Sequence, residues 1–256
     1  MSLGRRRPNL GGLTGAQLSP GPESHNRARH AVFVSQPLRV GVELGPRRTF
    51  AWAVDWPGWC RSGRGQEAAL AALAADGPRY FPVAAAAGAS LPAGLAGDVE
   101  VVERLPGSTT TDVGAPGTGG AAAARPLSLE AGRRLASLVS AAWGFFDQVA
   151  GHAPLELCTG PRGGGRDRDQ IVEHVLALDF VYARELGLTL PSRASDPTGF
   201  AELRAAVVRA LGTPASVITG PRGWPPQYYA RRAAWHVLDH AWEVQDRSEP
   251  SGGGPR

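Results

Sequence analysis

The sequence of 256 residues contains no lysine, so all 27 of its basic residues are arginine. It also lacks an apolar run long enough to cross a membrane. Its only two cysteines, Cys60 and Cys158, have no CxxC partner, and no apolar secretory segment follows the first arginines. These absences disfavour a membrane protein and a secreted, disulfide-bonded protein. We therefore expect a cytoplasmic protein with two free thiols.

The formal net charge is +4, which raises the question of a nucleic-acid partner. Residues 1–36 hold five arginines and one acid, whereas residues 37–106 hold seven of each and residues 127–247 hold thirteen of each. The excess positive charge therefore lies in the N-terminal segment and not on either candidate domain. Because no basic face is left to follow a phosphate backbone, we do not expect a nucleic-acid partner.

Composition divides the chain into five parts. Residues 1–36 and 248–256 are rich in Gly, Pro, Ser and Arg, and we expect them to be disordered tails. Residues 107–126 are a Gly/Ala/Thr/Pro stretch, which predicts a flexible linker. Between these segments, residues 37–106 predict a small α+β domain and residues 127–247 a helical domain, so the expected fold class is α+β.

The small domain shows the alternation that is typical of strands. Residues 38–44 and 49–56 alternate apolar with small or polar side chains on either side of a GPRR turn, which predicts a hairpin. Residues 67–75 are strong helix formers, and residues 98–104 alternate again. The expected unit is ββαβ.

Four helical stretches are expected in the second domain, at residues 128–149, 168–186, 197–211 and 226–246. Capping residues mark their starts, as where Asp167 precedes Gln170 by three positions. Helices of this length with apolar stripes favour packing as a four-helix bundle.

Three of the six histidines fall on these helices: His174 on the second, and His236 and His240 on the fourth. Four residues of helix turn through about 400°, so His236 and His240 lie only ~40° apart on one face. Three neutral imidazoles with an open fourth position suit zinc, and also nickel, iron or manganese. Asp239 and Glu243 lie beside the pair and could orient a ligand or act as a base. The alternative is a polar helix face that binds no ion.

The pentapeptide TGPRG occurs twice, at residues 159–163 and 219–223, each time before a histidine-bearing helix. One interpretation places Arg162 and Arg222 near helix N-termini, where they could bind an anionic substrate group. The other is that Gly-Pro and Arg-Gly simply form turns.

Trp52 and Trp56 fall on one face of the second predicted strand. We expect them in the core or in contacts between the domains. A platform on which a ligand stacks is the alternative.

Residues 127–247 resemble the DinB/YfiT-like family of bacterial four-helix proteins. The resemblance rests on His174 in IVEHVLALDFVYARELG and on His236 and His240 in YYARRAAWHVLDHAWEVQDR. Members of that family bind a divalent metal through one histidine on the second helix and an HxxxH pair on the last. The resemblance therefore implies that these three residues are metal ligands.

The N-terminal domain resembles the HicB-like fold of antitoxin relatives, through the stretch FAWAVDWPGWCRSGRGQEAALAAL. No helix-turn-helix or ribbon-helix-helix segment accompanies it in this sequence. The resemblance thus implies a module for packing or ligand binding rather than an antitoxin.

Together these resemblances imply a metal-dependent enzyme, either a thiol-dependent transferase or a hydrolase. Its expected partner is a small-molecule substrate such as a low-molecular-weight thiol, with a homodimer as the expected assembly. The alternative is a non-catalytic binding or regulatory protein, in which the HicB-like domain contacts a partner and the helical domain is structural.

Overall fold

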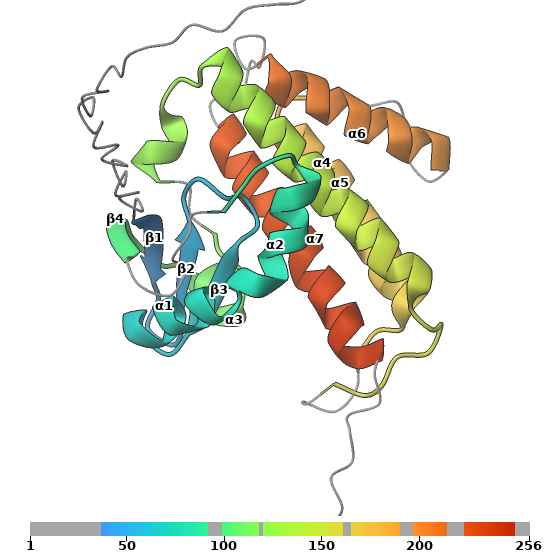
Figure 1. The fold of residues 1–256 in the computed structure, drawn as a ribbon, viewed down its shortest axis with the longest axis horizontal. Helices are drawn as coiled ribbons and strands as arrows, with labels where there is room; N and C mark the ends of the chain where they lie inside the picture. Colours follow the sequence, from blue (N-terminus) through green and yellow to red (C-terminus); the bar gives the residue numbers. More distant parts are fainter. Residues whose placement is uncertain are drawn as a thin grey trace, which may run out of the picture. The chain divides into compact units, whose positions relative to one another are not determined.

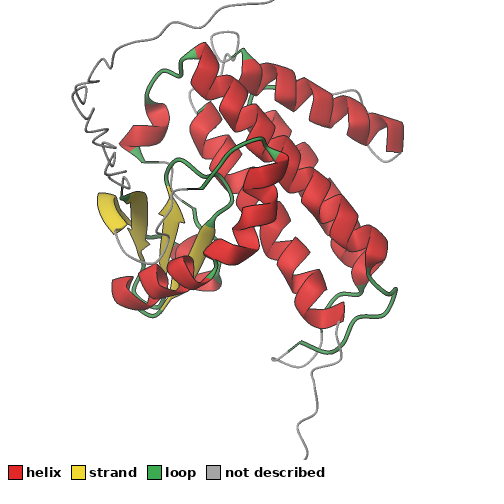
Figure 2. Ribbon diagram, in the orientation of Figure 1, coloured by secondary structure: helices red, strands yellow, loops and turns green. Residues whose placement is uncertain are grey.

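The computed structural model describes residues 37–91, 99–117, 120–160, 165–189, 197–213 and 223–248. The described residues form one compact unit. Within it a small mixed sheet precedes several helices, as Figures 1 and 2 show. The expected α+β fold class is therefore confirmed.

The sheet has the strand order β3-β2-β1-β4, built from four short segments. β1 (Leu38–Leu44) pairs antiparallel with β2 (Thr49–Ala53), which confirms the predicted hairpin. β2 pairs antiparallel with β3 (Cys60–Gly63), and β1 pairs in parallel with β4 (Val99–Pro106). The sequence did not predict β3, because its four residues CRSG carry no apolar alternation.

Two helices follow the third strand, where the sequence predicted only one. α1 (Gln66–Ala75) matches the predicted helix, and α2 (Gly77–Ala86) starts after a single intervening residue. α2 contains a proline in its first turn, where a helix tolerates it, and another in its interior, which disfavours a helix when the sequence is considered alone. Tertiary packing offsets that cost: Tyr80 of α2 is buried, stacks on Trp59 at 5.6 Å between ring centroids and donates a hydrogen bond to the Pro57 carbonyl.

The stretch that was predicted as a flexible linker contains α3 (Thr109–Val113) and the 3₁₀ helix η1 (Ala121–Ala124). Thr111 is buried, and its hydroxyl donates a hydrogen bond to the carboxylate of buried Glu43 on β1. The backbone N–H of Gly117 donates to the same carboxylate at 3.1 Å. This segment is therefore bound to the sheet, and the division into domains around it stays a prediction.

Four long helices occupy the rest of the chain, close to the predicted positions: α4 (Leu129–His152), α5 (Arg168–Glu185), α6 (Pro197–Gly212) and α7 (Pro226–Ser248). α4 packs on α6 and α7, and α5 packs on the same two helices. No helix in the described part of the chain combines the length and apolar character needed to cross a membrane.

α7 contacts both the sheet region and the helix α5. On one side a Cβ placed on Gly58, in the loop before β3, would touch Leu238 and Ala234 of α7, so the loop and the helix are in close contact. Gly58 has φ +93°, a conformation that glycine adopts without strain. On another side α7 faces α5 through His236. One helix therefore carries both the contact with the sheet region and the candidate site.

Candidate metal centre

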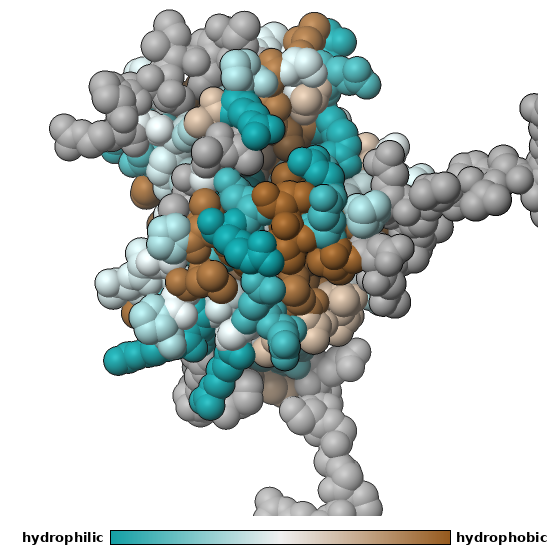
Figure 3. All heavy atoms as spheres, turned by 90° about the vertical axis from the view of Figure 1, so that its left-hand side faces the viewer, coloured by the Kyte–Doolittle hydropathy of each residue, from teal (hydrophilic) through white to brown (hydrophobic). Residues whose placement is uncertain are grey.

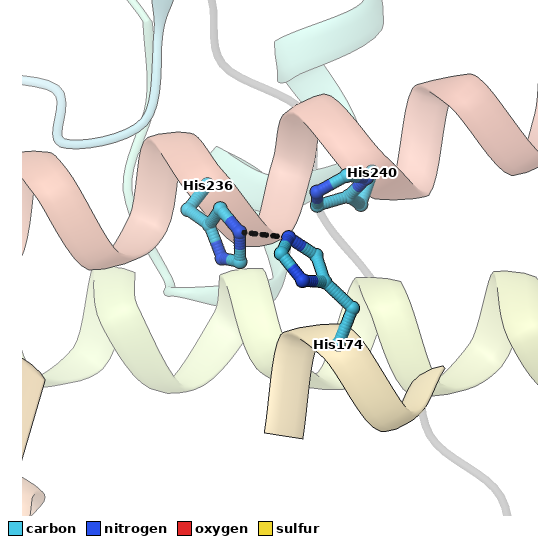
Figure 4. Close-up of side chains that lie close together, drawn as sticks. All are labelled: His174, His236 and His240. Atoms are coloured by element: carbon cyan, nitrogen blue, oxygen red, sulfur yellow. Dashed lines mark hydrogen bonds between the residues drawn. The ribbon is translucent and has the colours of Figure 1, made fainter. Parts of the chain in front are cut away.

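The three histidines that the sequence selected lie together in the structure (Figure 4). His174 projects from α5 toward His236 and His240 on α7, and the three ring centroids are 4.8 to 5.1 Å apart. The Nε2 atoms of His174 and His236 are 3.2 Å apart. The structure thus brings residues 62 positions apart in sequence to one point.

Local structure explains why these side chains face each other. α5 begins at Arg168, where the side-chain oxygen of Gln170 accepts a hydrogen bond from the backbone N–H of Asp167 at 3.0 Å, as the sequence predicted. Ile171 and Val175 of α5 are fully buried, which fixes the rotation of the helix and leaves His174 beside them at the edge of the core. The local pattern therefore determines where His174 points.

The spacing of the rings fits a single divalent ion. In a tetrahedral zinc site with Zn–N bonds of about 2.05 Å, the nitrogen atoms of two ligands are about 3.3 Å apart. The 3.2 Å between the Nε2 atoms of His174 and His236 agrees with that separation. One ligand atom from each of the three histidines lies within 4.8 Å of the others, so small side-chain rotations bring all three to one ion. The three histidines are close enough to hold a metal ion.

Burial keeps two of the imidazoles neutral. His236 is only 5% exposed, and this desolvation, together with the neighbouring His240 and His174, lowers its pKa to about 2. The pKa of His174 is also lowered, first by desolvation and then by His240. Metal ligation needs neutral imidazole, so both residues have the required protonation state at pH 7.

His240 is oriented by a carboxylate. Its Nδ1 lies 2.8 Å from an oxygen of Glu243, and since an ionised carboxylate only accepts, Nδ1–H is the donor. The Nε2 lone pair is therefore available to an ion, the arrangement that is usual for a metal-ligating histidine. The hydrogen bond from His240 is the main reason that the pKa of Glu243 is lowered. His236 has no such support in the described residues, because its Nδ1 is buried without a hydrogen-bond partner.

The two carboxylates that the sequence selected as candidate catalytic groups have different surroundings. Glu243 contacts His240, whereas the side chain of Asp239 is 53% exposed and lies 3.7 Å from the guanidinium of Arg61 on β3. Glu243 is thus connected to the histidine cluster, and Asp239 forms an ion pair toward the sheet.

Arg247 is a residue of this region that the sequence reasoning missed. Its guanidinium donates to Glu243 at 3.0 Å and to the backbone carbonyls of Cys158 and Arg166 at 2.8 and 2.7 Å. It therefore fixes the carboxylate that orients His240 and attaches the loop before α5 to the end of α7. The i, i+4 spacing of Glu243 and Arg247 on a helix could have revealed the pair.

Four further sequence-based candidates have different outcomes. Arg162 and Arg222, proposed to bind a substrate anion, lie outside the described residues. Cys60 and Cys158 are both free thiols, as expected. Burial raises the pKa of the Cys60 thiol to about 12, so it is unreactive at neutral pH.

The contacts above define the site without help from known proteins. Comparison of the chain with models of protein families, with curated proteins and with solved structures found no match.

Proposed function

We propose that this chain is a metal-dependent enzyme of the DinB/YfiT type that holds one divalent ion on His174, His236 and His240. The observation that carries the proposal is the convergence of three imidazoles from two helices at a spacing suited to one ion. Zinc is the first choice, because three histidines and one open position are a common catalytic zinc site. Nickel, iron and manganese are the alternatives.

Two features of the fold support the assignment to this type. α4, α5, α6 and α7 pack on one another in pairs, as the helices of a four-helix bundle do. The histidines occur on the second and the last of these helices. The HicB-like assignment of the N-terminal region has weaker support, from the β1–β2 hairpin, α1 and the later strand β4.

A divalent ion at this position would lower the pKa of a bound thiol or water and so supply an anionic nucleophile at neutral pH. The protein residues prepare the site for it. Burial keeps His174 and His236 neutral, and Glu243 holds the His240 ring with Nε2 directed away from the carboxylate. Glu243 thus acts as a positioning residue, itself fixed by Arg247.

The proposed substrate is a small molecule, such as a low-molecular-weight thiol, and the reaction is either thiol transfer or hydrolysis. The proposal rests on access as well as on ligands: the His240 side chain is 14% exposed and that of Glu243 is 35% exposed. The side where these two residues lie is therefore the route that we propose for the substrate. Arg162 and Arg222 are kept as candidates for binding a substrate anion.

The deciding experiment is metal analysis of the purified full chain after zinc supplementation and dialysis. We expect about one zinc ion per chain, loss of that ion in His236→Ala and in His240→Ala, and its retention in His152→Ala. His152 is a suitable control, because it lies at the exposed end of α4. A wild-type chain without stoichiometric metal after loading with zinc and then nickel would contradict the proposal.

A second measurement separates a catalytic site from a structural one. With cobalt(II) in place of zinc, a thiol that enters the open position produces a sulfur-to-cobalt charge-transfer absorption band. We expect that band on adding a small thiol, and we expect the metal-free chain to keep its helical circular dichroism. Unfolding on metal removal, with no thiol band, would assign the ion a structural role.

A non-catalytic function is favoured by one observation. β4 is an edge strand of the described sheet, and its residues Val99 and Val102 are more than one-third exposed. Edge strands with exposed apolar residues pair readily with another chain. In this alternative the HicB-like region binds a partner or a second copy of the chain. Light scattering of the purified chain, compared with a Val102→Lys variant, tests for the homodimer.

A further inference from the structure

A pocket of about 420 Å³ lies between the sheet, α4 and α7. One wall is formed by β4 and the end of β2, and the other by the first turns of α4 and α7. β4 lies at the left of Figure 1, and Figure 3 shows that side of the molecule, where hydrophobic residues are exposed between hydrophilic ones. Pockets that bind small molecules commonly measure roughly 300–1,000 Å³. The size is therefore that of a ligand site.

Most of the wall is apolar and held in place by packing. Trp52, Pro57, Leu135 and Tyr228 line the pocket, and each is buried in the fold. The Tyr228 hydroxyl donates to the Gly117 carbonyl at 3.1 Å, which fixes the ring. A ligand that enters here meets flat aromatic and aliphatic surfaces and would need a mainly apolar body.

A buried cation strengthens the case that this is a built site. Arg231 lines the pocket, is only 8% exposed, and places its guanidinium 4.1 Å from the Trp52 ring centroid and 5.2 Å from that of Tyr228. Glu43 and Glu103 are among the charges that act on it. A buried arginine is costly unless its charge is compensated, and these two carboxylates offset the charge of Arg231.

A second arginine provides the donors that a ligand can use. Arg134 of α4 stacks on Trp56 at 4.5 Å and donates one hydrogen bond to the Asp55 carbonyl. A guanidinium has five N–H donors, so most of them remain for a ligand. The Asp55 carboxylate is already paired with Arg39 at 3.2 Å. Among the described residues no carboxylate lies within ion-pair distance of Arg134.

One acceptor in the pocket wall is also unsatisfied. The side-chain oxygen of Gln227 is buried and has no hydrogen-bond partner among the described residues, while its amide nitrogen donates to the Arg125 carbonyl. A buried acceptor without a donor is unfavourable.

This pocket is separate from the histidine cluster. Arg231 and His236 are five residues apart on α7, which places them about 140° apart around the helix. Arg231 faces the sheet, and His236 faces α5. A molecule bound in the pocket would therefore not contact the three histidines.

From these contacts we propose that the pocket binds a small organic carboxylate with a flat, mainly apolar body. The body lies in the apolar part of the pocket, against Pro57, Leu135 and Tyr228, and the carboxylate accepts hydrogen bonds from Arg134. Arginine suits this role because its planar donors match a carboxylate. The site does not depend on metal at the histidine cluster.

The test uses 2-naphthoate as the probe and 2-naphthamide as its uncharged analogue, with calorimetric titration of the full chain. We expect saturable binding of one naphthoate per chain and at least about tenfold weaker binding of the amide, since hydrogen bonds to charged groups are worth more than neutral ones. Arg134→Gln should weaken naphthoate binding about tenfold and leave binding of the amide nearly unchanged.

Matched variants complete the design. Arg133→Gln alters the neighbouring, exposed arginine of α4 outside this pocket and should bind naphthoate like wild type. Ala131→Phe should block the pocket, and His236→Ala should leave naphthoate binding intact while removing metal. Absence of naphthoate binding, equal affinity for the amide, or an equal effect of the two arginine variants would overturn the proposal. If Ala131→Phe does not fold, the comparison of Arg134→Gln with Arg133→Gln decides.

Discussion

The two sides of α7 differ in how they handle polar groups. Toward α5, His236 and His240 meet His174 with their ring nitrogens facing one another. Toward the sheet, Arg231 stacks on Trp52, and Trp235 packs edge-to-face on Phe50 at 6.0 Å. The side toward α5 thus presents imidazole nitrogens, and the side toward the sheet presents aromatic rings.

The difference predicts which side a bound metal would affect. Aromatic contacts and buried apolar residues stabilise the sheet side without any added group. On the histidine side, burial and neighbouring imidazoles lower the pKa of His236. The fold therefore keeps this imidazole neutral, which favours metal binding rather than stability. Changes on the two sides should therefore affect metal binding and stability separately.

The largest effect should come from His236→Ala on the α5 side. Loss of a residue that only supports a metal ligand typically costs 10–100-fold in affinity, so loss of a ligand should cost more than about 100-fold. Competition with a chromogenic zinc chelator measures this. Removal of metal should lower the melting temperature of wild type and leave that of the variant unchanged. Equal zinc affinity in both proteins would show that His236 is not a ligand.

Leu238→Ala makes the corresponding change on the sheet side. Leu238 is fully buried and close to Gly58, so its truncation leaves a cavity and should lower the free energy of unfolding by about 2–5 kcal/mol. Urea denaturation of metal-free protein measures the loss. Zinc stoichiometry should remain that of wild type. A parallel loss of zinc would mean that the two sides of the helix do not act independently.

Asp179 extends the comparison to the buried contact between α5 and α6. It is 0% exposed, and burial raises its pKa to about 7, although the Arg204 guanidinium at 3.8 Å opposes that shift. Asp147, Tyr182 and Tyr229 are the other titratable groups that act on it or are acted on by it. Because the folded-state pKa lies above the unfolded value of about 3.9, folding favours the protonated form.

The stabilising contribution of protonated Asp179 is therefore complete below about pH 4 and is lost as the pH rises to about 7. The size of the loss is on the order of a few kcal/mol. In urea titrations of metal-free protein, the difference in unfolding free energy between Asp179→Asn and wild type should grow in favour of the variant over this range. A difference that does not change with pH would contradict the raised pKa.

Periodic patterns predicted the regular parts of this molecule. The hairpin of β1 and β2 and the four long helices follow from alternation, helical stripes and caps such as Asp167. β3 and α2 did not follow, because four polar or small residues show no strand alternation and the interior proline of α2 disfavours a helix. Their formation depends on the partners they meet in the fold, such as Trp59 for Tyr80 of α2.

The candidate site was predictable only in part, for a similar reason. The HxxxH spacing placed His236 and His240 on one face, the helical pattern placed His174 on another predicted helix, and the family resemblance implied that the three are ligands of one ion. Spacing on α7 could not show that Asp239 pairs with Arg61 of β3, because that contact depends on how the helix meets the sheet. The pocket lined by Trp52 and Arg231 could not be predicted for the same reason, because its walls come from segments that are far apart in the sequence.

The smallest effect sharpens the comparison between the two carboxylates beside the histidines. Glu243→Gln keeps the shape of the side chain but replaces the ionised acceptor that faces Nδ1 of His240. Zinc affinity should fall 10- to 100-fold, or about 1.4–2.7 kcal/mol. Asp239→Asn is the matched control, because Asp239 faces Arg61 on the sheet side.

Chelator competition on both variants, with circular dichroism to confirm folding, measures the contrast. If zinc affinity falls equally in both, the charge near the ion matters and the hydrogen bond does not, since a removed negative charge weakens cation binding from either position. If it falls only in Glu243→Gln, orientation of the His240 ring is the function of that carboxylate. The geometry supports the second outcome, because only Glu243 contacts a histidine, and Arg247 holds it there at 3.0 Å.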